Sequence, residues 1–513
     1  MKVARITLTL VLALLWRVAG ADPAADYQQH CANCHGPDRY GAMGPALLPE
    51  SLERLKKPEA VKVITAGRPA TQMQGFADRL PPEAIEALAQ WIYAPVSPAP
   101  EWTEAQIAAS RVVHHAPGTL PDRPSFAADP MNLFIVVEQG DHHVSILDGD
   151  RLEPIHRFPS RYALHGGPKF SPDGRYVYFA SRDGWVSKFD LWNLATVAEV
   201  RVALNTRNLA VSADGRHVLV ANYLPRTLVL LDADLGLERV YPAADLDGRT
   251  SRVSAVYDAA PRRSFVVAMK DIPELWEISY DPNAEPVHDG FVHDYKMGEG
   301  LAKPGYLNPR RTRLDAVLDD FFFDPSYRHV IGASRAAARG QVVNLDVRRK
   351  IADLDLPGMP HLASGITWAI DGRPVMATPN ISEGTLTVID MRDWRVVRQI
   401  PTLGPGFFLR SHERTPYAWA DAMMGPHKDT LQVIDKTSLE VVARLTAEPG
   451  KTLAHVEFTR DGRYALASLW EMDGALVVYD AATLQEVKRI PMRKPVGKYN
   501  LHNKLTRSAG TSH

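Results

Sequence analysis

The chain has 513 residues, a length that predicts two or three domains. Its 59 basic and 60 acidic residues nearly balance, which gives no support for a surface that binds nucleic acid or coats an anionic membrane. The two cysteines lie three positions apart, so a disulfide scaffold and a zinc ribbon are excluded.

Residues 1–21 have the pattern of a signal peptide. Met1–Arg5 is basic, Ile6–Trp16 is apolar, and Ala19–Ala21 offers small residues for cleavage. The apolar run is too short to span a bilayer comfortably, with an uncleaved anchor as the alternative. We expect an exported, periplasmic protein that begins near Asp22 and has no membrane span in its mature chain.

Residues 31–35 read Cys-Ala-Asn-Cys-His, the CxxCH pattern by which a c-type haem is attached. The thiols of Cys31 and Cys34 lie one helical turn apart and can form thioethers to one haem edge, while His35 binds the iron. A redox CxxC pair would not need the histidine. The pattern predicts a covalent haem c in a domain over residues 22–94.

A sixth iron ligand is expected further along the chain. Met73 follows a loop that contains glycine and proline, and Met43 is the alternative. The stretch Cys31–Tyr93 resembles a small class I cytochrome c, an all-α domain in which the methionine comes late, before a C-terminal helix. The resemblance favours Met73, and the periodicity of Pro82–Tyr93 predicts that helix. Met/His ligation suits electron transfer.

Residues 95–124 are rich in proline and predict a stiff linker or a strap. From Met131 onward one pattern recurs, an alternating hydrophobic run that usually ends in aspartate. Turns containing Asp-Gly, at 171–175, 212–216 and 460–463, are typical of β-hairpins. The eight hydrophobic runs end at Asp148, Asp190, Asp232, Ser279, Asp346, Asp390, Asp435 and Asp480.

The spacing of these runs is 42 residues among the first three and 45 among the last three. A period of about 40–45 residues predicts a β-propeller with four short strands in each blade. One gap of 67 residues is too long, so we expect Asp281–Arg313 to be an inserted loop over one face, often the ligand face. The predicted fold is mixed: a small all-α cytochrome c domain, then an all-β eight-bladed propeller over residues 125–513.

Motifs spread along the propeller point to one family. They are residues 162–175 (YALHGGPKFSPDGR), 181–184 (SRDG), 190–192 (DLW), 358–361 (GMPH), 411–412 (SH) and 497–500 (GKYN). These stretches resemble the d1-haem propeller of the cytochrome cd1 nitrite reductases and their biosynthetic relatives. The resemblance covers essentially the whole mature chain. It implies that haem d1 or dihydro-haem d1 binds non-covalently.

Two branches of this family compete. In the nitrite reductases, His165 matches the proximal iron ligand and His361 matches one of two distal histidines that protonate nitrite. The other distal position falls at Leu318, which cannot donate a proton. His455 is instead typical of the branch that resembles dihydro-haem d1 dehydrogenase. That resemblance implies His455 as the iron ligand and His361 with Tyr499 as the catalytic pair, with His165 as the alternative ligand.

The dehydrogenase branch oxidises a propionate of the tetrapyrrole to an acrylate and passes the electrons to its own haem c. A base such as His361 can take a proton from a carbon beside a carboxylate, and Tyr499 can donate a hydrogen bond. Cationic side chains can bind the substrate's carboxylates, but each can equally be part of a structural ion pair. Candidates for binding the tetrapyrrole are His165, Lys169, Arg182, Arg207 and His412, with Arg161 nearby.

Three functions stay open from the sequence. The favoured one is an oxidoreductase, the dihydro-haem d1 dehydrogenase of the last step of haem d1 biosynthesis. The others are a cytochrome cd1 nitrite reductase and a d1-haem carrier. For the dehydrogenase, the expected partners are the tetrapyrrole substrate, a d1-haem nitrite reductase that receives the product, and a periplasmic electron acceptor.

Overall fold

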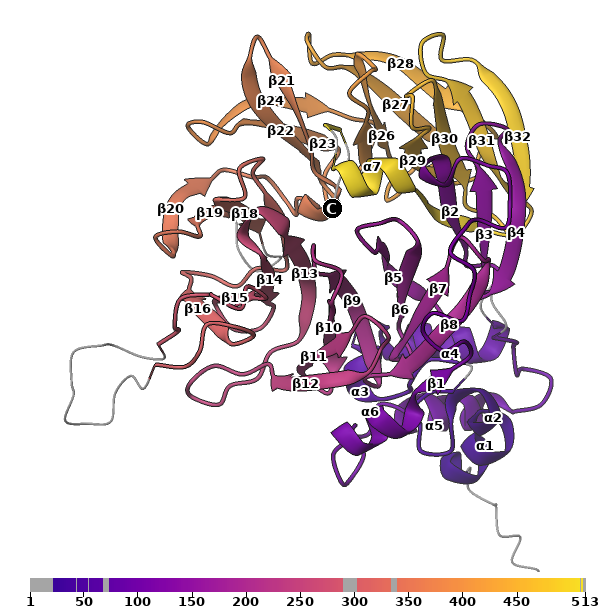
Figure 1. Ribbon diagram of the computed structural model, residues 1–513. Coiled ribbons are helices and arrows are strands. Elements are labelled where there is room, and N and C mark those ends of the chain that lie inside the picture. The colour runs from indigo at the N-terminus through magenta and orange to yellow at the C-terminus, as the bar shows by residue number, and fades with distance from the viewer. Residues whose placement is uncertain are drawn as a thin grey trace, which may run out of the picture.

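A computed structural model describes residues 22–42, 44–53, 55–67, 73–288, 302–333, 339–507 and 509–510. It shows a small helical domain beside a ring of β-sheets arranged around a central axis (Figure 1). The predicted signal peptide and Met43 lie outside the described residues. In the ranges just given, no helix is long and apolar enough to cross a membrane.

The helical domain is built from short helices with strong start signals. At the first of them, the Asp22 carboxylate accepts hydrogen bonds from the N–H groups of Ala24 and Ala25, and Pro23 opens the helix. The last confirms the helix predicted over Pro82–Tyr93, because it buries Ile85 and Leu88 on one face. The helices are α1 (Pro23–His30), α2 (Ala32–His35), α3 (Pro49–Leu52), α4 (Lys57–Ala66) and α5 (Pro82–Trp91).

Eight antiparallel sheets form the blades, which confirms the eight-bladed propeller. From the axis outward, the first four sheets are β5 (Leu164–Phe170), β6 (Tyr176–Ser181), β7 (Trp185–Asp190), β8 (Ala195–Arg201); β9 (Asn205–Val211), β10 (His217–Leu224), β11 (Thr227–Asp232), β12 (Leu237–Pro242); β13 (Val253–Ala259), β14 (Ser264–Met269), β15 (Glu274–Ser279), β16 (Pro309–Arg313); β17 (Asp320–Phe323), β18 (His329–Ala333), β19 (Gly340–Asn344), β20 (Arg349–Leu354).

The next three sheets follow the same order, and the last one joins the two ends of the propeller. They are β21 (Ile366–Ile370), β22 (Arg373–Pro379), β23 (Thr385–Asp390), β24 (Arg395–Pro401); β25 (Leu409–Ser411), β26 (Tyr417–Asp421), β27 (Thr430–Asp435), β28 (Val441–Thr446); β29 (Leu453–Phe458), β30 (Tyr464–Leu469), β31 (Gly474–Asp480), β32 (Glu486–Met492); β33 (Pro495–Asn500), β2 (Leu133–Glu138), β3 (His143–Asp148), β4 (Glu153–Pro159).

The recurring hydrophobic run of the sequence is the third strand of each blade. Seven of these strands end at the predicted residue, and β19 ends at Asn344, two residues before Asp346. The predicted Asp-Gly turns join the first and second strands of their blades, where Gly174, Gly215 and Gly462 take φ values of 73°, 71° and 72°. Such φ values favour glycine, which explains why the turn residues recur with the strands.

The sequence pattern missed how the ring closes. The innermost strand of the last blade, β33, comes from the C-terminal end of the chain and pairs with β2 from Phe134↔Asn500 to Val137↔Gly497. The closing sheet therefore takes three strands from one end of the propeller and one from the other. After β33, helix α7 (Leu501–Thr506) lies near the centre of the ring (Figure 1).

The prediction of an inserted loop over Asp281–Arg313 needs correction. Pro309–Arg313 is not part of a loop but forms β16, because the third blade needs an outer strand. The described part of the insertion lies at the outer rim, where the Leu307 carbonyl accepts hydrogen bonds from Arg239 and Tyr241 on β12. The expected placement over a ligand face therefore gains no support, and residues 289–301 lie outside the described ranges.

Residues 95–124 form an ordered strap rather than a bare linker. They contain α6 (Glu104–Ser110) and β1 (Val112–Val113), and β1 adds a fifth, outer strand to the first blade. The Trp102 indole donates to the Arg201 carbonyl at 2.8 Å, and Ile107 is buried against blade residues.

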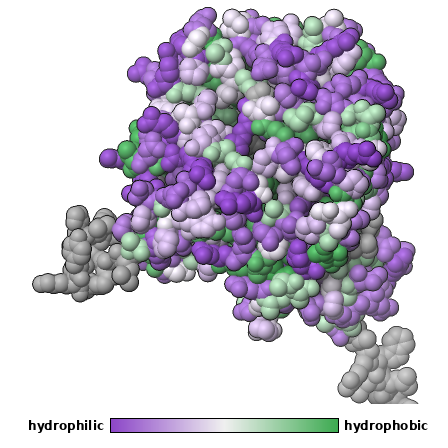
Figure 2. Space-filling view, in the orientation of Figure 1, coloured by the Kyte–Doolittle hydropathy of each residue, from purple (hydrophilic) through white to green (hydrophobic). Residues whose placement is uncertain are grey.

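The short 3₁₀ turns are η1 (Pro130–Asn132), η2 (Ala260–Arg262) and η3 (Leu362–Ser364). The face shown in Figure 2 is largely hydrophilic, with small separate apolar patches.

Candidate active site

The haem c residues form one compact group at the start of the helical domain. Cys31 and Cys34 are unpaired thiols at the ends of one turn, and His35 is 8% exposed. The His35 Nδ1 lies 2.8 Å from the Pro45 carbonyl oxygen, which places the proton on Nδ1 and leaves the Nε2 lone pair for a metal. Burial lowers the pKa of His35, so the imidazole is neutral, as a ligand must be.

Two further features fit a haem beside these residues. A Cβ on Gly44 would lie 2.8 Å from the His35 ring, so only glycine lets the histidine occupy this position. Met73 packs against the hydrophobic core of the domain, in the same cluster as Cys31. Thiols, imidazole and thioether are the donor set of a c-type haem.

In the propeller, His165 stands near the start of the inner strand β5. Its Nδ1 lies 2.6 Å from the carbonyl oxygen of Arg207 on β9. This carbonyl accepts the Nδ1 proton, so Nε2 carries the lone pair, as in most metal-binding histidines. The Arg207 guanidinium lies 4.2 Å from the centre of the Tyr223 ring.

His361 has a similar anchor on the other side of the ring. It directly precedes η3, and its Nδ1 lies 2.8 Å from the Phe407 carbonyl oxygen. Its ring centre is 3.9 Å from that of Phe407. The carbonyl fixes the tautomer and leaves Nε2 as the basic nitrogen.

His455 and Tyr499 lie side by side on β29 and β33. Their ring centres are 5.2 Å apart, and Phe408 is 4.6 Å from His455 on its other side. Among the described residues, the buried His455 Nε2 has no hydrogen-bond partner. Buried polar atoms in native proteins are normally satisfied, so this nitrogen indicates a place for a bound molecule. Burial, with the cations Lys498 and Arg410 adding to it, lowers the pKa of His455 well below its ordinary value.

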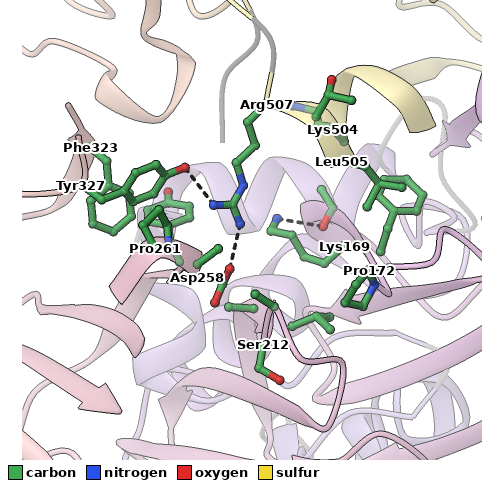
Figure 3. A pocket seen from close by; sticks show the side chains of 18 of the residues that line it. Lys169, Pro172, Ser212, Asp258, Pro261, Phe323, Tyr327, Lys504, Leu505 and Arg507 are labelled. Carbon is green, nitrogen blue, oxygen red and sulfur yellow. Dashed lines mark hydrogen bonds and ion pairs between the residues drawn. The ribbon is translucent and has the colours of Figure 1, made fainter. Parts of the chain in front are cut away.

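Tyr499 also lines a cavity of about 570 Å³ along the propeller axis (Figure 3). Burial raises the pKa of Tyr499 to about 12, so its hydroxyl keeps its proton at neutral pH. Lys169 lines the cavity too, donating to the Gly166 carbonyl at 2.6 Å, and burial lowers its pKa to about 8. On the far side Arg507 donates to Asp258 and to the Tyr327 hydroxyl, both at 2.8 Å.

The structure thus brings His361, His455 and Tyr499 into one aromatic cluster with Phe407 and Phe408. The two phenylalanines connect the histidines, because their ring centres are 4.7 Å apart. Sequence reasoning missed both, since a Phe-Phe pair before a strand is indistinguishable from ordinary core. Lys169 lines the same cavity as Tyr499, and the backbone approaches the Tyr499 ring at Gly167, where a Cβ would lie 3.1 Å from it.

The other candidates lie elsewhere. His412 follows β25 at the opposite end of the inner strand, where it packs against Phe458 and the hairpin glycine Gly462. Arg182 is exposed in the turn between β6 and β7. Arg161 donates two hydrogen bonds to the Glu199 carboxylate, at 2.7 and 2.8 Å. This is a structural ion pair, the alternative to carboxylate binding that the sequence left open.

Comparisons with known proteins agree with this arrangement. The family model described as Cytochrome D1 heme domain matches residues 128–504. The model described as Cytochrome C oxidase, cbb3-type, subunit III matches residues 18–92. A protein of Pseudomonas aeruginosa named Dihydro-heme d1 dehydrogenase is 57% identical over 100% of both chains. A Nitrite reductase of Stutzerimonas stutzeri is 24% identical over 93% of this chain and 92% of its own.

A solved structure shows the same architecture. It is titled Dihydro-heme d1 dehydrogenase NirN in complex with DHE, and it is 58% identical with a TM-score of 0.86. The match covers 94% of this chain and 100% of the other. The d1-haem family model spans well over half of the sequence, and the relative from Pseudomonas aeruginosa is 57% identical over the full length of both chains. The chain belongs to the cytochrome d1 haem domain family.

Proposed function

We propose that this protein is a dihydro-haem d1 dehydrogenase, an oxidoreductase that converts a propionate side chain of the tetrapyrrole to an acrylate. The full-length identity to an enzyme of that name carries the proposal. The reaction turns –CH2–CH2–COO⁻ into –CH=CH–COO⁻ and releases two protons and two electrons. A covalent haem c, held by Cys31, Cys34, His35 and Met73, supplies an electron acceptor, one electron at a time.

For the iron of the substrate, His455 and His165 are the two candidate ligands. A metal-binding histidine almost always donates its second ring N–H to a carbonyl or carboxylate, and His165 donates to Arg207 in this way. His455 Nδ1 instead faces the amine of Lys498 at 3.4 Å. His361 has the same kind of carbonyl anchor as His165, whereas the buried Nε2 of His455 has no hydrogen-bond partner among the described residues. We therefore keep His455 as the proposed ligand, with His165 as the alternative.

The proton acceptor proposed for the reaction is His361, with Tyr499 as a hydrogen-bond donor. The carbonyl of Phe407 fixes His361 with a basic Nε2, which suits removal of a proton from carbon. Tyr499 holds its proton and can donate to the substrate carboxylate. His455, directly beside Tyr499, adds a second polar group on the same side of the cluster.

The carboxylates of the tetrapyrrole need cations. Lys169 lines the same cavity as Tyr499, and Arg207 adjoins His165 through its carbonyl. Both are proposed to bind these carboxylates, Lys169 as a point charge and Arg207 as a fork. Roles for Arg182 and His412 rest on the resemblance alone. Arg161 is left out because Glu199 already occupies its guanidinium.

Periplasmic location is also part of the proposal. It rests on the signal-peptide pattern of residues 1–21 and on the CxxCH motif, since c-type haems are attached outside the cytoplasm. There a d1-haem nitrite reductase would receive the product, and a periplasmic carrier would take the electrons from the haem c.

One assay separates this function from its alternatives. The purified holoprotein is mixed with dihydro-haem d1 without oxygen, and the haem c reduction band and the product are followed together. We expect haem c reduction with formation of the acrylate, and no nitrite turnover. Nitrite turnover would favour a nitrite reductase, although Leu318, fully buried in an apolar cluster, offers no second proton donor. Binding without conversion would favour a carrier.

A further inference from the structure

We propose that Lys498 is a positioning residue whose amine holds the strand bulge that carries His455 against Tyr499. The proposal deepens the proposed function and depends on it for the chemical role of His455. The placement of Lys498 itself depends only on contacts within the chain.

His455 occupies an unusual position in its strand. The register of β29 against β30 shifts between Ala454 and Val456, so His455 is the extra residue of a β-bulge. Its φ is 51°, in the left-handed region that non-glycine residues rarely adopt. Such a conformation persists only where the surroundings hold it in place.

Lys498, on the neighbouring blade, holds His455 in this conformation. Successive residues of a strand point to opposite sides. Tyr499 lines the cavity beside Gly167, and Lys498 lies between β33 and the β29 blade. Its Nζ donates to the His455 carbonyl oxygen and to the Ser468 hydroxyl, the latter at 2.9 Å. The two bonds tie the bulge to β30 on one side and to β33 on the other.

Burying the Lys498 amine at this site costs free energy. Lys498 is 0% exposed and adjoins an apolar cluster that includes Val136 and Leu466. Across the described part of the chain, no carboxylate lies within ion-pair distance of it; Glu457, Asp421 and the cation Arg410 act on it only from further away. An amine buried without a carboxylate partner is destabilising on its own, so its hydrogen bonds to the His455 carbonyl and the Ser468 hydroxyl must offset that cost.

Protonation of Lys498 does not decide the outcome. Burial lowers its pKa well below the ordinary value. A neutral amine still has two N–H groups, enough for the His455 carbonyl and the Ser468 hydroxyl. The bulge is therefore held in either state.

The test compares Lys498→Met with Lys188→Met. Methionine keeps the length and removes the amine, and replacing a buried charge by an apolar group often preserves stability. Lys188 is a matched control, because it is 4% exposed and pairs with Asp234, well outside the histidine cluster. Thermal melting of both variants shows whether each is folded.

Two readouts are taken from the folded proteins. In ligand-free protein, we expect faster amide exchange across Leu453–Phe458 for Lys498→Met and the parental rate there for Lys188→Met. In turnover with dihydro-haem d1, we expect kcat to fall about tenfold or more for Lys498→Met with KM little changed, and parental kinetics for the control.

The outcomes separate the two proposals. Parental amide exchange across this strand in Lys498→Met would overturn the positioning role, whatever the activity. Faster exchange with parental turnover would support the positioning role and count against a part for His455 in the proposed reaction. If the parent protein does not convert dihydro-haem d1 at all, the exchange experiment still decides the role of Lys498.

Discussion

His165 and His455 are both candidate ligands of the d1 iron, and the partners of their ring nitrogens differ. His165 gives its Nδ1 proton to a carbonyl, whereas His455 has an amine beside that nitrogen. We expect His455→Ala to change the absorption spectrum of bound dihydro-haem d1 more than His165→Ala does, because the buried His455 Nε2 has no other partner among the described residues and loss of an axial ligand alters the iron itself. A larger change in His165→Ala would assign the iron to His165 instead, as in the nitrite reductase arrangement.

Met73 is the proposed sixth ligand of the haem c, and it packs beside Cys31 in the domain core. In Met73→Ala both thiols remain, so the haem should stay attached while the methionine ligation signal disappears and the reduction potential falls. Visible absorption and a potentiometric titration measure this. Met43→Ala is the control. If Met43→Ala loses the methionine signal and Met73→Ala keeps it, Met43 is the sixth ligand instead of Met73.

The buried Asp421, at the edge of the aromatic cluster, should make the stability of the protein depend on pH. It is 2% exposed and accepts the N–H groups of Phe407 and Phe408 at 2.8 and 3.0 Å. Burial raises its pKa from 3.8 to about 6. The folded protein then binds this proton more tightly than the unfolded chain, so the stability it contributes is complete below pH 3.8 and is lost as pH rises through 6.

Asp421→Asn removes this titration. Between pH 4 and 7 the free energy of unfolding of the variant should therefore rise relative to the parent, by at most about 3 kcal/mol. Urea unfolding at the two pH values measures the difference. A constant difference between variant and parent would show that Asp421 does not titrate in this range.

Among the elements, the repeating strands were predictable and the ends were not. The hydrophobic run ending in aspartate is local, so β7, β11 and β27 follow directly from it. The pairing of β33 with β2 joins residues more than 350 positions apart, and no local pattern encodes such a contact. Likewise, GKYN was visible as a motif, but the burial of Lys498 between two blades depends on that closure.

Helix α7 follows the closing strand, and its attachment can be tested. Leu501 is 0% exposed and packs in the cluster of Leu133, Val177 and Phe179. Leu501→Ala should cost about 2–5 kcal/mol, because it removes buried methyl groups and leaves a cavity. Denaturant unfolding of the propeller measures this. Leu505→Ala, on a partly buried neighbour in the same cluster, should cost less, and equal losses would contradict the packing argument.

In the whole molecule, electrons must pass from the propeller to the helical domain, so the contact between them matters. Arg201 ties three parts together. Its guanidinium donates to the Tyr40 carbonyl of the helical domain at 2.5 Å and to the Asp183 carbonyl of the first blade at 2.9 Å, and it lies over the Trp102 ring of the strap. A planar fork with several donors can make these contacts at once, which a single ammonium cannot.

Arg201→Met should therefore loosen the helical domain without touching either haem site. We expect slower haem c reduction by dihydro-haem d1, with unchanged substrate affinity and unchanged reduction by ascorbate, since ascorbate reaches the haem c directly. Stopped-flow absorption at the haem c band measures both reductions. Arg216→Met is the control, because Arg216 is exposed and forms its ion pair with Asp214 in its own turn. If Arg201→Met transferred electrons at the parental rate, the remaining contacts between the domains, such as the pair of Arg252 and Glu53, would be sufficient to hold the two sites in register.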